Sequence, residues 1–172
     1  RQGRGKSISL LHGFDSSVLE FRYLLPLLAE DYETWAVDLL GFGFTERIRN
    51  IDYNPESIKA HLYSFWMLIN QPLILIGASM GGATAIDFVL DYPQAVDKLV
   101  LMNSVGFSGD FPIGKLLFPP FDYLAVEYWR QRKLQALFWN SFNQSSQLID
   151  AIRCASLHLD MPYWYEAMLS FM

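Results

Sequence analysis

The sequence predicts an α/β fold: a partial, parallel, doubly wound sheet with a region of helices beside it. Three observations support this fold class. Short apolar runs alternate with longer stretches of helical periodicity. The runs are nearly all apolar, as in strands that helices cover on both faces of a parallel sheet. With 172 residues and 52% hydrophobic content, the chain can also bury a sizeable core, which favours one domain.

The first strand is expected at residues 7–11 (SISLL), because this apolar run ends at the loop signal His12-Gly13. A helix is expected next, since four apolar residues recur at helical spacing: Phe21, Leu24, Leu25 and Leu28. Pro26 requires that this helix starts or kinks there, because proline lacks the backbone N–H of a helix interior.

The second strand is expected at residues 34–38 (TWAVD), ahead of a loop with two glycines. Asn54 and Pro55 then mark the start of a helix, since asparagine caps free backbone N–H groups and proline suits the first helical position. One face of that helix is apolar: Ile58, Leu62, Phe65 and Ile69. This strand and helix form the clearer of the first two units.

The third strand is expected at residues 73–76, its helix at 80–90 and a fourth strand at 98–102. Right-handed crossovers are the default connections between parallel strands in one sheet. Four strands with intervening helices therefore account for the first part of the chain.

After Asn103 the composition changes, with frequent glycine, proline and aromatic residues and no further strand pattern. We expect a core at residues 1–110 and a helical cap or lid at residues 111–172. The helices of the second part are expected to form a layer over one end of the sheet. We find no internal repeat, low-complexity segment or flexible linker.

Charge and composition argue against several classes of protein. The net charge of −5, from 13 basic and 18 acidic side chains, offers no basic face for nucleic acid. No apolar run reaches the roughly 18 to 20 residues that span a bilayer, and the first residues lack the apolar segment of a secretory signal. We therefore expect a soluble protein without a transmembrane segment, in the cytoplasm, with a plastid as the alternative.

Two smaller features favour structural roles. Cys154 is the single cysteine and lies in an apolar helical pattern, so a buried thiol is expected. Three neighbouring basic residues are expected to form a solvated helix face: Arg130, Arg132 and Lys133. No residues show a metal-ligand spacing, and we expect neither a metal nor a cofactor.

The sequence GASMG at residues 77–81 places Ser79 between the third strand and a helix rich in small residues. A strand that turns into a helix at one residue strains that residue, and side chains two positions away would collide, which explains the glycines. The helix starting near Met80 directs its first N–H groups at the place where charge would develop on a carbonyl. The loop at residues 12–14 could supply a second donor.

These features resemble the α/β-hydrolase superfamily, in its cap-bearing, esterase-like branch with a serine nucleophile. The resemblance rests on HGF at residues 12–14, DLLGFGFTE at 38–46 and GASMGG at 77–82, in the family's order. It covers essentially all of the chain. It implies that these strands are the third to sixth of the family's sheet.

The resemblance implies that Ser79 is the nucleophile and that the backbone N–H groups of Phe14 and Met80 form the oxyanion hole. Such donors contribute about 3 kcal/mol each to transition-state stabilisation. The serine would form an acyl-enzyme that water hydrolyses. Relatives that open epoxides or displace halide carry aspartate here, so carboxylic ester hydrolysis fits best, with thioester, amide, carbon–carbon bond and peroxy-acid chemistry as neighbours.

In the family, the acid and the histidine of the triad follow the serine in sequence. His158, the downstream histidine, lies in the helical tail, which disfavours it as the base. Some relatives carry the acid where Asn103 stands, and Asp110 is expected to be a loop or hinge residue. We therefore expect an internal piece of a longer hydrolase, with acid and histidine outside the chain and little or no hydrolysis by the segment alone.

The other two histidines are expected to be structural. His12 belongs to the first motif and would hold that loop by hydrogen bonding. His61 borders the apolar stripe of the second helix, so a partly buried or surface position is expected.

The cap region is rich in aromatic residues, which favours a small hydrophobic acyl or aromatic substrate, although packing of the cap onto the core explains any one of them at least as well. They are Phe111, Phe118, Phe121, Tyr123, Tyr128, Trp129, Phe138, Trp139, Phe142, Tyr163, Trp164 and Tyr165. The alternative function is a non-catalytic ligand-binding or scaffold protein that keeps the hydrolase fold. No feature of the sequence sets the oligomeric state.

Overall fold

The computed structural model describes residues 1–105, 121–140 and 146–171, and its centre is a four-stranded sheet. The strands are parallel and lie in the order β2-β1-β3-β4. Their bounds are β1 Ser7–Leu11, β2 Glu33–Val37, β3 Leu73–Ala78 and β4 Val96–Met102. The α/β class and all four predicted strands are confirmed, each strand within two residues of its expected limits.

The helices follow the predicted order along the chain. Their bounds are α1 Leu24–Leu28, α2 Pro55–Ile69, α3 Met80–Asp91, α4 Phe121–Asn140, α5 Ser146–Ser156 and α6 Trp164–Phe171. Short 3₁₀ turns occur at Val18–Phe21, Pro93–Ala95 and Leu157–Asp160. The helices predicted to begin at Pro55 and Met80 therefore begin where expected.

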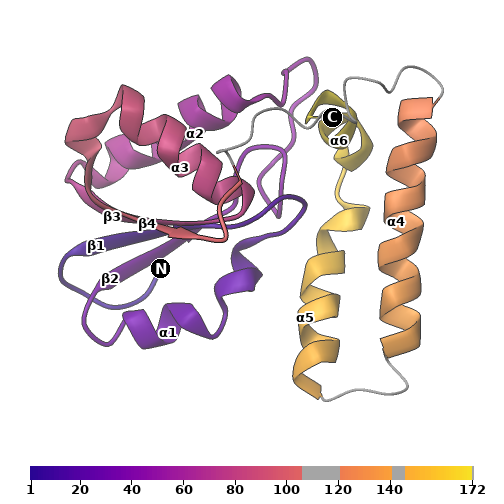
Figure 1. The fold of residues 1–172 in the computed structure, drawn as a ribbon, viewed down its shortest axis with the longest axis horizontal. Coiled ribbons are helices and arrows are strands. Elements are labelled where there is room, and N and C mark those ends of the chain that lie inside the picture. Colours follow the sequence, from indigo (N-terminus) through magenta and orange to yellow (C-terminus); the bar gives the residue numbers. More distant parts are fainter. Residues whose placement is uncertain (106–120, 141–145, 172) are drawn as a thin grey trace.

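Helices cover both faces of the sheet, as the apolar strands predict. Helices α2 and α3 lie on one face and α1 lies on the other (Figure 1). Along β3, Leu75 packs in the cluster with Leu62 of α2, whereas Ile74 and Ile76 pack with Phe21 on the opposite face. Alternate side chains of one strand thus enter two different apolar clusters, which requires helices on both sides.

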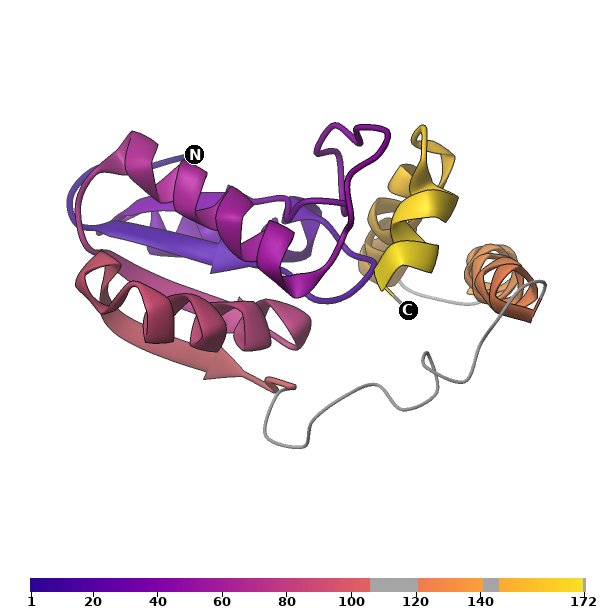
Figure 2. The ribbon, with the colours of Figure 1, turned by 90° about the horizontal axis from the view of Figure 1, so that it is seen from above.

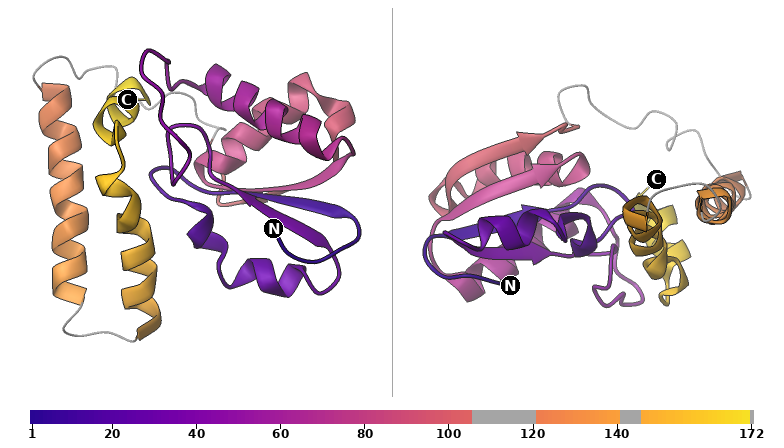
Figure 3. Two further views of the ribbon diagram at one scale, coloured as in Figure 1. Left: turned by 180° about the vertical axis from the view of Figure 1, so that it is seen from behind. Right: turned by 90° about the horizontal axis from the view of Figure 1, so that it is seen from below.

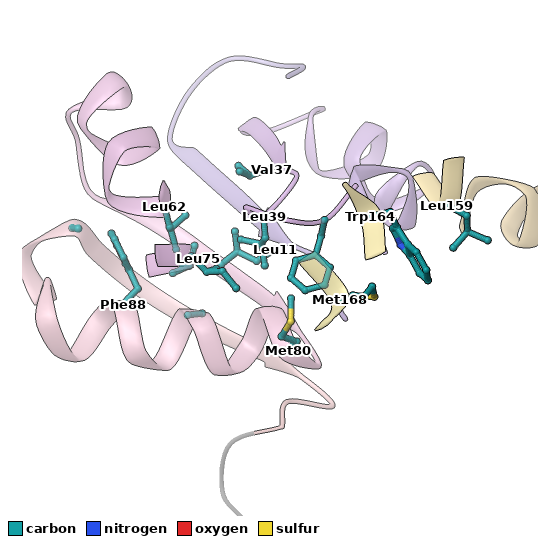
Figure 4. Close-up of a cluster of buried hydrophobic side chains, with 14 of the residues drawn as sticks. Leu11, Val37, Leu39, Leu62, Leu75, Met80, Phe88, Leu159, Trp164 and Met168 are labelled. Atoms are coloured by element: carbon teal, nitrogen blue, oxygen red, sulfur yellow. The ribbon is translucent and has the colours of Figure 1, made fainter. Parts of the chain in front are cut away.

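The helices α4, α5 and α6 and the 3₁₀ turn Leu157–Asp160 are called the tail below. They form a layer beyond one end of the sheet, as predicted. Figures 1 and 2 show α4 farthest from the sheet, with α5 and α6 between them, and Figure 3 shows the same arrangement from behind and below. One apolar cluster joins the two parts (Figure 4). It includes Leu11 and Met80 from the sheet side and Leu159, Trp164 and Met168 from the tail.

Two local predictions differ from the structure. The helix expected around Pro26 is split into a 3₁₀ turn and the one-turn helix α1, in which Pro26 is the third residue and its missing N–H costs no intrahelical bond. Strand β4 is largely exposed, with Val100 43% and Met102 42% accessible. It pairs with β3 alone among the described strands, so it lies at the edge of the sheet.

Asn54 caps α2, and we expect Asn54→Ala to lower the free energy of unfolding by about 1 kcal/mol. Its side-chain oxygen accepts a hydrogen bond from the Ser57 N–H at 2.9 Å, and the Ser57 hydroxyl lies 3.1 Å from the Asn54 N–H. Alanine leaves the Ser57 N–H without this partner. Urea unfolding of the two proteins measures the loss, and Asn54→Asp, which retains an acceptor, serves as the control. Equal stability of Asn54→Ala and wild type would contradict the assignment of this cap.

Candidate active site

Ser79 occupies the single-residue turn between β3 and α3. Its backbone has φ 50° and ψ −116°, a conformation that residues with a side chain rarely adopt. The end of β4 holds this turn in place, because the Ser79 N–H donates to the carbonyl of Met102 at 3.0 Å and the Val105 N–H donates to the carbonyl of Ser79 at 3.2 Å. Such strain persists only where the surrounding structure maintains it.

The glycines beside Ser79 are required by close backbone contacts, as the motif predicts. A Cβ atom on Gly77 would lie 2.4 Å from the carbonyl oxygen of Gly81. A Cβ atom on Gly81 would lie 2.3 Å from the carbonyl oxygen of Leu11 and 2.5 Å from that of His12. The start of α3 therefore packs directly against the end of β1, which no side chain at these positions would allow.

The loop after β1 passes against the serine. In the sheet, Leu11 of β1 pairs with Gly77 of β3, so the carboxyl ends of both strands lie at the same edge. A Cβ atom on Gly13 would lie 3.4 Å from the Cβ atom of Ser79. The structure thus brings together the two loops that the sequence predicts to meet, with Phe14 next to Gly13 and Met80 next to Ser79.

His12 is fully buried and holds this loop with both ring nitrogens. Its Nε2 accepts a hydrogen bond from the Leu39 N–H at 3.1 Å, so the ring proton lies on Nδ1, which donates to the carbonyl of Gly13 at 2.7 Å. Burial lowers the pKa of His12, and this outweighs the opposing effects of the Gly13 carbonyl and of the Asp38 charge. The neutral ring therefore has the structural role that the sequence predicts.

We expect the free energy of unfolding to decrease as the pH falls from about 7 to about 5. The pKa of His12 in the folded chain lies below its ordinary value of 6.5, so the unfolded chain takes up the proton first and stability is lost below that pH. Burial also lowers the pKa of His61. Urea unfolding at both pH values measures the change. His12→Asn should weaken the pH dependence more than His61→Asn does, and the reverse order would contradict the buried neutral ring.

The second motif forms a loop around Asp38. One carboxylate oxygen accepts from the Val18 N–H at 2.6 Å and the other from the Phe44 N–H at 3.0 Å. The buried Arg47 donates to the carbonyls of Gly41 and Gly43, both at 3.1 Å. These contacts assign DLLGFGFTE a structural role beside the site.

The structure also contains a buried cluster that sequence reasoning missed, centred on Asp15. Asp15 is 2% exposed, and among the described residues the side chains that contact its carboxylate come from the tail. The contacts are His158 Nε2 at 2.8 Å, Trp129 Nε1 at 2.8 Å, Trp164 Nε1 at 3.2 Å and Lys133 Nζ at 2.5 Å. No sequence pattern pairs these residues; the one available signal is an acidic residue directly after HGF.

The Asp15 cluster contains Lys133, whose predicted position was wrong, and His158. Lys133 was expected on a solvated helix face, but it is mostly buried against Asp15, because an unpaired buried carboxylate needs a cation. His158 is fully buried and bonded to Asp15 rather than to Ser79 among the described residues. Burial alone would raise the pKa of Asp15, but the His158 hydrogen bond and the Lys133 charge lower it below its ordinary value.

The other residues that the sequence analysis considered have these positions. His61 is partly buried, as predicted, and Cys154 is half-buried rather than buried. Asn103 is exposed, with φ 44°, and Asp110 lies outside the described residues. Within the described ranges, no group of His, Cys, Asp or Glu has the arrangement of a metal site. None of the described helices combines the length and the apolar character needed to cross a membrane.

A groove of about 300 Å³ lies between α2 and α3 and reaches Met80. Its lining is mostly apolar: Pro55, Ile58, Met80, Ala83, Thr84, Ile86, Asp87 and Leu90. Neither Ser79 nor the loop after β1 lines it, so we do not assign it to the reacting part of a substrate.

Comparison with known proteins identifies a family for this chain. A family model described as alpha/beta hydrolase fold matches residues 6–151. Alpha/beta hydrolase domain-containing protein VTE7 of Arabidopsis thaliana is 39% identical, over 96% of this chain and 52% of that protein. The 2-hydroxy-6-oxo-2,4-heptadienoate hydrolase of Pseudomonas putida is 35% identical, over 65% of this chain and 42% of that protein.

A solved structure gives the same result. The meta-cleavage product hydrolase of Pseudomonas fluorescens IP01 matches with a TM-score of 0.69 and 26% identity, over 98% of this chain and 62% of that one. The chain therefore spans about half the length of the curated relatives that it matches.

Proposed function

This chain belongs to the alpha/beta hydrolase fold family, and from that premise we propose that it carries the nucleophile of a serine hydrolase. The reaction is cleavage of a carboxylic ester or related acyl bond of a hydrophobic small molecule through an acyl-enzyme on Ser79. The observation that carries the proposal is the strained turn at Ser79, with Gly13 packed against its Cβ atom. A strained serine at a strand-to-helix turn exposes its hydroxyl for attack.

The two proposed oxyanion donors come from two segments that meet at this turn. Met80 is the first residue of α3, whose N-terminus favours negative charge. Phe14 follows Gly13 in the loop against Ser79. In the reaction, the Ser79 hydroxyl would attack the acyl carbon and lose its proton to a base, while the carbonyl oxygen gains charge between the two N–H groups.

The base and the acid belong to parts of the protein outside this chain in our proposal. Among the described residues, no histidine or carboxylate is bonded to Ser79, and His158 is engaged by Asp15. The exposed edge of β4 next to the serine turn provides a place where a further strand could pair. We therefore propose that the segment alone has little or no hydrolytic activity.

Aromatic rings near the loop after β1 support a hydrophobic acyl substrate. The ring of Phe14 lies 5.6 Å from that of Phe42 and 6.4 Å from that of Trp129. The Pseudomonas putida relative is named as a hydrolase of 2-hydroxy-6-oxo-2,4-heptadienoate, a small unsaturated acid. Carboxylic ester hydrolysis remains our first proposal, and hydrolysis of a carbon–carbon bond is the alternative reaction. We propose the cytoplasm or a plastid as the compartment.

The second candidate is a non-catalytic protein that binds a ligand on the same fold. The observation in its favour is that no base contacts Ser79 in the part of the chain that the structure describes. Ligand binding that survives Ser79→Ala in a protein without turnover would favour it.

A fluorophosphonate ester tests the proposal in the full-length protein, because it forms a stable bond only with an activated serine. We expect one adduct, on the tryptic peptide of residues 60–98 and at Ser79 within it. The matched control is Ser64→Ala on the same peptide, since the Ser64 hydroxyl donates to the carbonyl of Ala60 one turn earlier in α2. An adduct elsewhere, or none in the folded protein, would count against the nucleophile.

A further inference from the structure

The carboxylate of Asp15 joins the loop after β1 to the tail helices. Its oxygens accept from Trp129 and Lys133 on α4, from His158 in the 3₁₀ turn Leu157–Asp160 and from Trp164 on α6. Lys133 also donates to the backbone carbonyl of Asp15 at 2.7 Å. Three separate elements of the tail therefore meet at one residue of the loop.

These partners require a carboxylate rather than an amide at position 15. Trp129, Trp164 and Lys133 offer only N–H groups, so His158 completes the set as a donor when its ring proton lies on Nε2. An ionised carboxylate accepts all of these bonds, whereas the NH₂ group of asparagine would face a donor. The positive charge of Lys133 also balances the buried negative charge of Asp15.

Asp15 holds the backbone in an unusual conformation. Its φ is 48°, in the left-handed region that non-glycine residues adopt only when their surroundings maintain it. The bonds to both carboxylate oxygens and to the backbone carbonyl supply that constraint. Without these bonds we expect the loop to relax toward ordinary backbone angles.

The other end of the loop is held independently of the tail. The Gly13 N–H donates to Glu20 at 3.0 Å, and the Gly13 carbonyl accepts from His12. Because the peptide bond is planar and trans, fixing the Gly13 carbonyl directs the Phe14 N–H to the opposite side. Phe14 therefore lies between two residues with fixed positions. Gly13 is held by His12 and Glu20, and Asp15 is held by the tail.

We propose that Asp15 is a positioning residue for the oxyanion hole, through which the tail helices hold the Phe14 N–H against Ser79. This inference rests on the proposed function, since it assigns a role to Asp15 in the same reaction. Asp15 acts through the backbone of Phe14. The tail thereby helps to position a group that stabilises the transition state.

The test is Asp15→Asn in the full-length protein, with two readouts. We expect the rate of fluorophosphonate labelling at Ser79 to fall by about 10- to 100-fold, and kcat for a p-nitrophenyl ester by a similar factor, with little change in KM. Hydrogen exchange of the backbone amides at residues 12–15 should become faster. The matched control is Asp91→Asn, which removes one of the three carboxylates that contact Lys59 between α2 and α3 and should change neither readout.

Trp129→Phe guards against an Asp15→Asn protein that does not fold. It retains a ring beside Phe14 and removes one N–H from Asp15, so it should fold and reduce labelling by about 3- to 10-fold. Folded variants that label Ser79 at the wild-type rate would overturn the inference. Absence of labelling in wild type would count against the proposed function instead. In that case unchanged exchange of residues 12–15 in the variants would still overturn the role of Asp15.

Discussion

Replacing Ser79 by alanine should lower kcat of the full-length hydrolase by a factor on the order of 10⁴ or more. Alanine removes the atom that forms the acyl-enzyme, and the oxyanion donors alone provide only residual catalysis. The fold should be retained, because the Ser79 hydroxyl makes no capping bond to α3 and alanine differs from serine by one atom. We expect the free energy of unfolding to change by less than about 1 kcal/mol.

Initial rates with a p-nitrophenyl ester and urea unfolding measure these two quantities on the same samples. Ser64→Ala provides the matched control on α2, with wild-type kcat expected. Robust turnover by a folded Ser79→Ala protein would refute the assignment of the nucleophile. Full retention of ligand binding with no turnover in either protein would favour the non-catalytic reading.

Gly81→Ala should destabilise the chain by about 3 kcal/mol. The new Cβ atom would lie 2.3 Å from the carbonyl oxygen of Leu11 and 2.5 Å from that of His12. Both are backbone atoms at the end of β1, so the start of α3 must move away from the sheet. Alanine is the better helix former by about 1 kcal/mol, so any net loss has to come from this contact. A loss of this size is a large part of the stability of an ordinary domain.

Gly13→Ala is the informative comparison for that prediction. Its Cβ atom would lie 3.4 Å from the Cβ atom of Ser79 and 3.8 Å from the Ala78 carbonyl, which are tolerable distances. We therefore expect a stability close to wild type but a reduced labelling rate, because a methyl group would stand next to the nucleophile. Urea unfolding and fluorophosphonate labelling of both variants separate the two effects. A Gly81→Ala protein as stable as wild type would show that α3 does not need this close approach.

Local residue order was enough to predict most of the fold. The apolar runs SISLL and LILI predict β1 and β3, and the helical spacing between them predicts the helices. This works because the pattern of apolar and polar residues along a short segment depends on that segment alone. Asn54 and Pro55 mark the start of α2 for the same reason, since a cap acts within one turn. The glycines around Ser79 predict a tight turn, and the close contacts of Gly77 and Gly81 agree with it.

Contacts between distant parts of the chain could not be predicted in this way. The helix expected around Pro26 is split into two short elements. Strand β4 is exposed because it pairs with β3 alone among the described strands, and its own residues do not show this position. Lys133 was expected in solvent because it belongs to a local cluster of basic residues. Its burial follows from a carboxylate 118 residues away.

By itself, the sequence determined the α/β class, the strand and helix order and the serine turn, since each depends on periodicity or on steric limits among neighbouring residues. Only the tertiary structure decided that Asp15, His158 and two tail tryptophans meet in one buried cluster. Asp15 and His158 are 143 residues apart, and no local pattern records such a pairing. The physical reason is that a buried carboxylate takes its partners from whatever elements the packing brings to it.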